Sequence, residues 1–130
     1  MPSAPISLAI EQPERFTLKL NDSPIDADNA SGWWVDQSIH TIPLAHASLK
    51  SGRNTVSLMI DDYSEKDGLE MIFLLGDFGV NLVDNTPTIT ELPLKLSVGD
   101  WVKQALPFYS GAVRYETSIS LKNQPENSLA

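Results

Sequence analysis

The residues of this chain best suited to chemistry are aromatic side chains that stand close to carboxylates. Trp33 and Trp34 are followed by Asp36 in the stretch SGWWVDQS, Asp77 precedes an aromatic residue in GDFG, and Tyr109 ends the stretch PFY. Aromatic rings can stack on the apolar C–H face of a sugar while carboxylates accept its hydroxyl groups, a combination typical of small-molecule sites. We therefore predict a sugar site at one loop end of the fold, where the aromatic residues stack and the aspartates accept hydroxyl groups. Its predicted ligand-binding residues are Trp34, Asp36, Asp77 and Tyr109.

The same aromatic residues could instead fill a core, because most tryptophans of β-sandwiches are buried. If residues 31–36 are extended, neighbouring side chains point to opposite faces. Trp33 and Val35 then share one face, and Trp34 and Asp36 share the other. We expect the apolar pair in the core and the aromatic–carboxylate pair at the surface.

An acidic stretch, DDYSEKDG, covers residues 61–68. Loops rich in carboxylates can bind Ca²⁺, which takes six to eight oxygen ligands. The EF-hand spacing fails, because Lys66 stands at the fifth position counted from Asp62 and the glycine comes one place late. We expect a solvated turn and no cofactor; the alternative is a structural Ca²⁺ bound by Asp61, Asp62 and Asp67.

No catalytic motif stands out in the chain. It has no GxSxG, Walker A, HExxH or GxGxxG pattern. A glycosidase needs two facing carboxylates about 5 to 9 Å apart in a cleft, and no acidic pair here has a distinctive context. We therefore expect no catalytic residue in this chain.

Composition narrows the class of protein further. The chain has 130 residues, which suits one domain, and no cysteine, which excludes disulfides. Its net charge of −8 disfavours binding to nucleic acids and to anionic membranes. No apolar run approaches the ~20 residues of a membrane span, and the N-terminus lacks the features of a signal peptide. Its localisation is left open.

Alternation of apolar and polar residues with a period of two dominates the chain and favours β-strands. Phe16, Leu18 and Leu20 alternate before the turn residues 21–24, which predicts a hairpin that returns through Ile25. About seven strands separated by turns rich in Gly, Pro, Asn and Asp predict an all-β fold, an antiparallel β-sandwich.

Other segments extend this pattern. Residues 68–80 are apolar on both faces and predict a central strand. A half-buried strand is expected at 112–121 and a short helix, capped by an aspartate, at 99–106. Long loops are expected at 26–33, 61–68 and 79–88.

Three stretches occur in an order that resembles a known family. Residues 20–22 (LND), 42–44 (IPL) and 49–56 (LKSGRNTV) are similar to the sugar-binding jelly roll of family-2 glycoside hydrolases. Asp22 replaces the family's usual glycine and Arg53 its usual glutamate. The stretches LEMIFLLGDFGV and LPFYSGAVRYETSISL are similar to segments of large bacterial rhamnosidase-like or family-2-type hydrolases. The resemblance covers residues 6–121.

The resemblance implies a galactose-binding-like jelly roll that packs beside the catalytic barrel of a larger glycoside hydrolase. Residues 1–130 would be a single module excised from that protein, and 112–130 also resemble the first strand of a following domain. Such a module binds glycan weakly or shapes the neighbouring active site, so its partners would be carbohydrate and adjacent domains. The alternative is a structural or interaction β-sandwich without a ligand.

Overall fold

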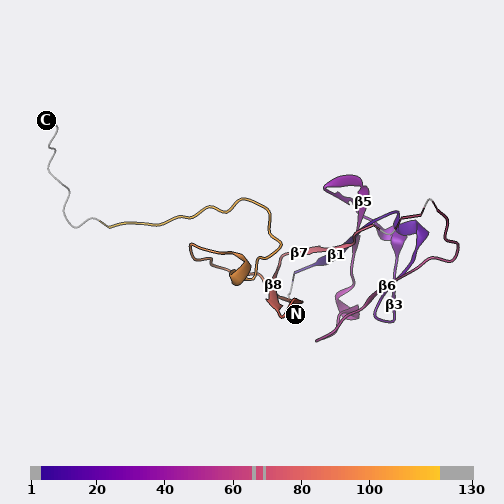
Figure 1. Cartoon of the computed structure of the whole chain (residues 1–130), viewed down its shortest axis with the longest axis horizontal. Helices are drawn as coiled ribbons and strands as arrows, with labels where there is room; N and C mark the ends of the chain where they lie inside the picture. The colour runs from indigo at the N-terminus through magenta and orange to yellow at the C-terminus, as the bar shows by residue number, and fades with distance from the viewer. Residues whose placement is uncertain (1–3, 66, 69, 121–130) are drawn as a thin grey trace.

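The computed structural model of the protein describes residues 4–65, 67–68 and 70–120 (Figure 1). This part of the chain contains nine short β-strands, all paired antiparallel, and four single-turn 3₁₀-helices, but no α-helix. The predicted all-β, antiparallel fold is confirmed at this level. No helix in the described residues is long and apolar enough to cross a membrane.

Seven of the strands form two small sheets. The larger sheet has the order β4 (Trp33–Trp34), β5 (Asp36–Pro43), β1 (Ile6–Glu11) and β7 (Phe73–Gly76). The smaller sheet has the order β3 (Ser23–Ile25), β2 (Thr17–Leu20) and β6 (Val56–Met59). The chain passes from β1 to β2 through the 3₁₀-helix η1 (Pro13–Arg15), and Gln12 turns into it with a left-handed φ of 46°. The first two strands therefore belong to different sheets.

The two sheets pack face to face through one hydrophobic cluster. The larger sheet contributes side chains of β1 and β5, and the smaller sheet contributes side chains of β2. The fully covered members of the cluster are Ile6, Leu8, Ile10, Leu18, Leu20, Ile42 and Leu44. This cluster gives the described residues a sandwich-like core that sits between β1 and β2.

A network of amides fastens the β2–β3 turn to the turn before β6. Asn21 takes a left-handed φ of 56°, and its Nδ2 donates to the Ser48 carbonyl (2.8 Å) and to Asn54 Oδ1 (3.1 Å). Asn54 Oδ1 also accepts from the Lys50 amide at 2.8 Å, and Asn21 Oδ1 accepts from the Thr55 amide at 3.1 Å. The predicted hairpin is confirmed, and these two asparagines hold it to the chain that enters β6.

The remaining two strands form a separate hairpin. Strand β8 (Phe78–Val83) pairs with β9 (Thr86–Glu91) along its whole length. Asp84 and Asn85 both have positive φ values, 49° and 61°, as a two-residue turn of type I′ requires. The expected long loop at 79–88 is therefore wrong, because an Asp–Asn pair adopts this turn readily.

The chain after β9 has little regular structure. The 3₁₀-helix η4 (Val102–Gln104) occupies the place of the expected helix at 99–106, and Asp100 Oδ1 accepts from the Val102 amide at 3.0 Å. The Val80 amide donates to the Ala105 carbonyl at 2.8 Å, which ties this segment to β8. Residues 112–120 form no strand, so that prediction is wrong for them; residues 121–130 lie outside the described residues.

The expected central strand is also corrected. Strand β7, within the predicted stretch 68–80, lies at an edge of the larger sheet, and its Leu74 is 43% exposed. The interior strands of this sheet are β5, which pairs with β4 and β1, and β1, which pairs with β5 and β7. Ala9 of β1 has no exposed surface although it points away from the core side, so β1 is covered on both faces at this position.

The core assignment predicts a strong contrast between two neighbouring positions of β2. Leu18→Ala should lower the free energy of unfolding by about 2 to 5 kcal/mol, because Leu18 is 2% exposed and its loss leaves a cavity. Lys19→Ala, on the exposed face of the same strand, should change it by less than about 0.5 kcal/mol. Urea unfolding of both variants checks this, and equal effects would contradict the register of β2.

Candidate functional site

The hairpin of β4 and β5 reverses the chain in a very short space. Trp34 pairs with Asp36, so Val35 alone forms the tip, and the register shifts between Trp33 and Trp34. Val35 has a left-handed φ of 65°. A β-branched residue is rare in this region, where a non-glycine residue costs about 1–2 kcal/mol. The tip of this hairpin is therefore strained.

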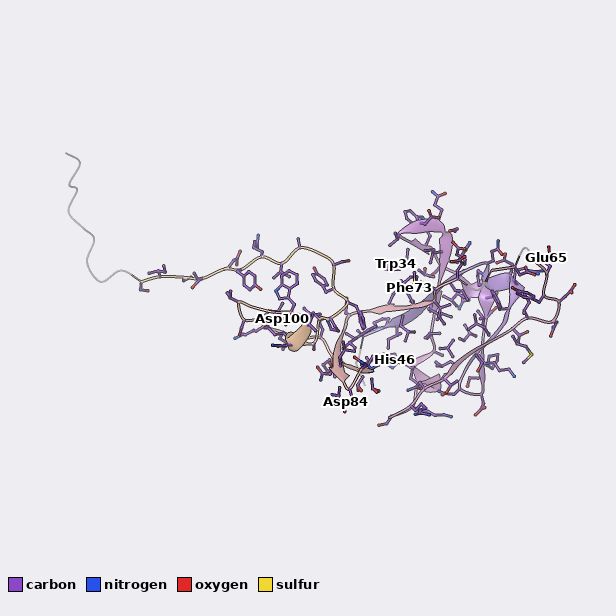
Figure 2. The ribbon with its side chains drawn as sticks, viewed as in Figure 1. Trp34, His46, Glu65, Phe73, Asp84 and Asp100 are labelled. Carbon is purple, nitrogen blue, oxygen red and sulfur yellow. The ribbon has the colours of Figure 1, made fainter. Side chains whose placement is uncertain are left out.

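Trp34 is held against the outer face of the larger sheet. Its ring packs on Phe73 of β7, with ring centroids 4.7 Å apart and planes tilted by 56° (Figure 2). Phe73 lies opposite Ala9 on β1, so its ring stands on the same face of the sheet as that small side chain. Ala9 is completely buried and Trp34 is half-buried.

Trp33 and Val35 do not enter the core. They are 58% and 75% exposed, so the expected burial of this apolar pair is wrong. The expectation assumed a straight strand through residue 36. The turn at Val35 breaks that alternation, and Trp33, which pairs with His40, projects at the edge of the sheet.

Asp36 carries the polar part of the hairpin. Its Oδ1 accepts from the Ser38 amide at 2.8 Å, and Ser38 Oγ donates to Glu11 Oε1 at 2.8 Å. The hydrogen bonds from the Ser38 backbone and side chain lower the pKa of Asp36. Two carboxylates and a hydroxyl group are therefore joined through Ser38 in this hairpin, and Asp36, which pairs with Trp34, is an anionic acceptor at neutral pH.

The structure does not bring Asp77 to this place. Asp77 follows Gly76, which pairs with Ile6 at the start of β1, whereas the β4–β5 hairpin lies near Glu11 at its end. Five residues along a strand correspond to about 17 Å. The expectation that all four predicted residues share one loop end is thus corrected.

Tyr109 belongs to a third region. Its ring meets Trp101 edge to face, with centroids 6.1 Å apart, and its hydroxyl donates to the Ala112 carbonyl at 3.0 Å. The Trp101 Nε1 donates to the Tyr115 hydroxyl at 2.6 Å. Of the predicted ligand-binding residues, the structure therefore brings together only Trp34 and Asp36.

The acidic loop is closed by a charge pair. Asp67 Oδ1 lies 2.7 Å from Arg15 Nη2 of η1, and Asp67 Oδ2 accepts from the Ser64 amide at 2.7 Å. The hydrogen bonds from Ser64 and then Arg15 lower the pKa of Asp67. Asp61 and Asp62 are exposed, and the described residues hold no group of three metal-ligating side chains. The structural Ca²⁺ remains an untested alternative.

Several residues of the hairpin site were not predicted. Phe73 lies in a stretch expected to be a buried central strand, and Glu11 and Ser38 carry no motif of their own. In the stretch IEQPERF, the proline two residues after Glu11 indicates that a strand ends near Glu11. Nothing in that stretch indicates which strand pairs with it. Their roles depend on pairings between segments far apart in the sequence.

Comparison of the chain with protein-family models, with curated proteins and with solved structures finds no match in any of the three. The resemblance to family-2 glycoside hydrolases therefore remains a prediction. The functional conclusion depends on the geometry of the chain itself.

The closure of the acidic loop gives a prediction. In Asp67→Asn, which keeps the shape but removes the charge, the Ser64 amide should exchange with solvent several-fold faster. Asp61→Asn makes the same charge change on an exposed side chain and should leave that exchange rate unaltered. Amide hydrogen exchange measured by NMR tests both.

The lowered pKa of Asp67 adds a pH dependence. The stabilisation from its contacts is complete above the ordinary carboxyl pKa of 3.8 and is lost as the pH falls through the lower pKa of the folded state. A carboxyl-carbon NMR titration should therefore give Asp67 a midpoint below 3.8. A midpoint at or above that value would contradict the loop contacts.

Proposed function

We propose that this chain is a non-catalytic accessory domain that binds glycan weakly through the β4–β5 hairpin. In this proposal the fold is of the galactose-binding-like jelly-roll type and the parent protein is a larger glycoside hydrolase. The sandwich-like core and the order of the stretches at 20–22, 42–44 and 49–56 support it. Fold type alone does not establish a function, so the site has to carry the argument.

The exposure of Trp33 is the observation that carries the proposal. A tryptophan that is 58% exposed on a two-residue edge strand contributes little to a core. It lies two residues before Val35, whose backbone is strained, and strained positions cluster at sites where a particular geometry is used. A purely structural sandwich would be expected to bury all its tryptophans.

The chemistry of the hairpin suits a sugar. Trp33 supplies a ring that can stack on the apolar face of a pyranose, and Asp36 supplies an anionic acceptor for hydroxyl groups. Trp34, which we expected to stack on the ligand, instead packs on Phe73 and supports the hairpin. The platform is open rather than a deep cleft, which favours weak binding over catalysis.

Titration of the protein with mono- and oligosaccharides tests the proposal. Tryptophan fluorescence and backbone NMR shifts should change at residues 33–38 within tens of millimolar of at least one sugar. Trp33→Ala should abolish the change, and Asp36→Asn should weaken binding several-fold because a neutral amide accepts hydroxyl groups less strongly.

Asp28→Asn serves as the control for charge, because Asp28 is an exposed aspartate outside the hairpin. It should bind like the original protein. Absence of any shift with the whole sugar panel, or equal binding by Trp33→Ala, would refute glycan binding at this hairpin.

A second candidate function, docking to an adjacent domain, is favoured by the C-terminal surface. Leu94, Val98 and Phe108 are 99%, 86% and 71% exposed. Exposed apolar side chains in such number mark interaction surfaces. In this alternative the chain acts as a structural or interaction domain whose partner covers residues 92–108.

Leu94→Asp tests this alternative. Because the Leu94 side chain is exposed and does not pack in the core, the substitution should change the free energy of unfolding by less than about 0.5 kcal/mol. Its affinity for the adjoining domain of the parent protein, measured by calorimetry, should fall at least about tenfold. Unchanged affinity would exclude this surface as the docking site.

A further inference from the structure

An apolar groove runs along the open side of the sandwich, between β6 and the chain that enters β7. Its volume is about 420 Å³. Asp67 and Glu70 lie at its lining among apolar residues. The apolar lining residues are Phe16, Leu58, Ile60, Tyr63 and Ile72. None of these five is fully buried, so the core is incomplete on this side.

Strand β6 forms the edge of the smaller sheet at this groove. One side of β6 pairs with β2, and in the described residues no strand pairs with its other side. An edge strand presents a row of backbone donors and acceptors that can pair with another extended chain. A strand added here would lie beside β6, with its side chains next to Leu58 and Ile60 at the groove.

The chain itself contains a segment with the matching pattern. Residues 112–120 run as an extended trace (Figure 1) and pair with no strand of the described residues. Arg114 Nη2 lies 2.9 Å from Glu116 Oε1, so these two side chains share one side of the segment. The alternation of an extended chain then places the apolar Val113, Tyr115 and Ile119 on the other side.

This segment cannot fill the groove of its own molecule in the observed conformation. It leaves the sandwich at the end remote from the loop that follows β6 (Figure 1). The hydrogen bond from Trp101 to the Tyr115 hydroxyl, 2.6 Å long, holds its first half on the C-terminal region. Ile119 is 79% exposed. Its apolar side is thus presented to other molecules.

We propose that residues 112–120 of one copy add as a strand to β6 of a second copy and cover the groove with their apolar side. Ile119 and Tyr115 then contact the side chains around Leu58 and Tyr63, while Arg114 and Glu116 face solvent. The Tyr115 hydroxyl exchanges its exposed hydrogen bond to Trp101 for water. Reciprocal exchange of the two segments gives a closed dimer with two equivalent contacts.

Analytical ultracentrifugation of the full chain over a wide concentration range tests the exchange. The protein should show a reversible monomer–dimer equilibrium. Ile119→Asp should weaken dimerisation at least about tenfold, because it places a charge on the buried side. Ser118→Asp adds the same charge to the same segment on the outer side and should leave dimerisation unchanged. Both residues are exposed, so neither variant affects the core.

Mixing complementary variants separates strand exchange from any other self-association. Tyr63→Asp replaces a side chain that is 70% exposed, so it should place a charge in the apolar groove and leave residues 112–120 unchanged. Tyr63→Asp and Ile119→Asp should each self-associate at least about tenfold more weakly than the original protein, whereas a mixture of the two should form a heterodimer more readily than either variant self-associates, through the one intact groove and the one intact segment. Any of three results would overturn the proposal. The protein could stay monomeric throughout, Ile119→Asp and Ser118→Asp could affect the dimer equally, or the mixture could form no heterodimer.

Discussion

The packing of β1 against β2 is the interaction on which the rest of this structure depends. Leu8 on β1 and Leu18 on β2 are 1% and 2% exposed, and Ile42 on the neighbouring β5 is completely covered. Strand β1 also pairs with β5 on one side and β7 on the other, so it joins three of the four strands of the larger sheet, and its apolar side chains pack on the smaller sheet. A change that moved β1 would disturb the core, the larger sheet and the support of Trp34 at once.

The size of this core determines which surfaces remain for function. Among the described residues, the fully buried apolar side chains all come from the first 44 positions except Val80. The later part of the chain therefore keeps many apolar side chains outside, along the groove beside β6 and on residues 92–120. Both functional proposals use side chains that the core does not cover: Trp33 at the hairpin, and Ile119 on the unpaired segment.

Sequence reasoning succeeded where local alternation decides the structure and failed where distant pairing does. The alternation of Leu18 and Lys19 predicted the β2–β3 hairpin, because one face of that hairpin meets the core and the other meets water. The stretch ISLAIE looks like a half-buried strand at most, yet Ala9 is completely covered on the face opposite the core, where Phe73 of β7 lies beside it. The left-handed turn at Val35 could not be predicted from the sequence, because valine rarely adopts a positive φ. This turn determines the register of Trp33 and Trp34, so their faces were also predicted wrongly.

Hydrogen exchange measured by mass spectrometry on the full chain, at a concentration at which ultracentrifugation shows only monomer, tests the central claim most directly. That claim is that a small core around β1 and β2 holds the molecule together and leaves the C-terminal region uncovered. Amides of β1 and β2 should be the most protected, with protection close to that of global unfolding, and those of residues 106–120 should exchange nearly as fast as an unfolded chain. Equal protection of residues 112–120 and β1 under these conditions would contradict the account.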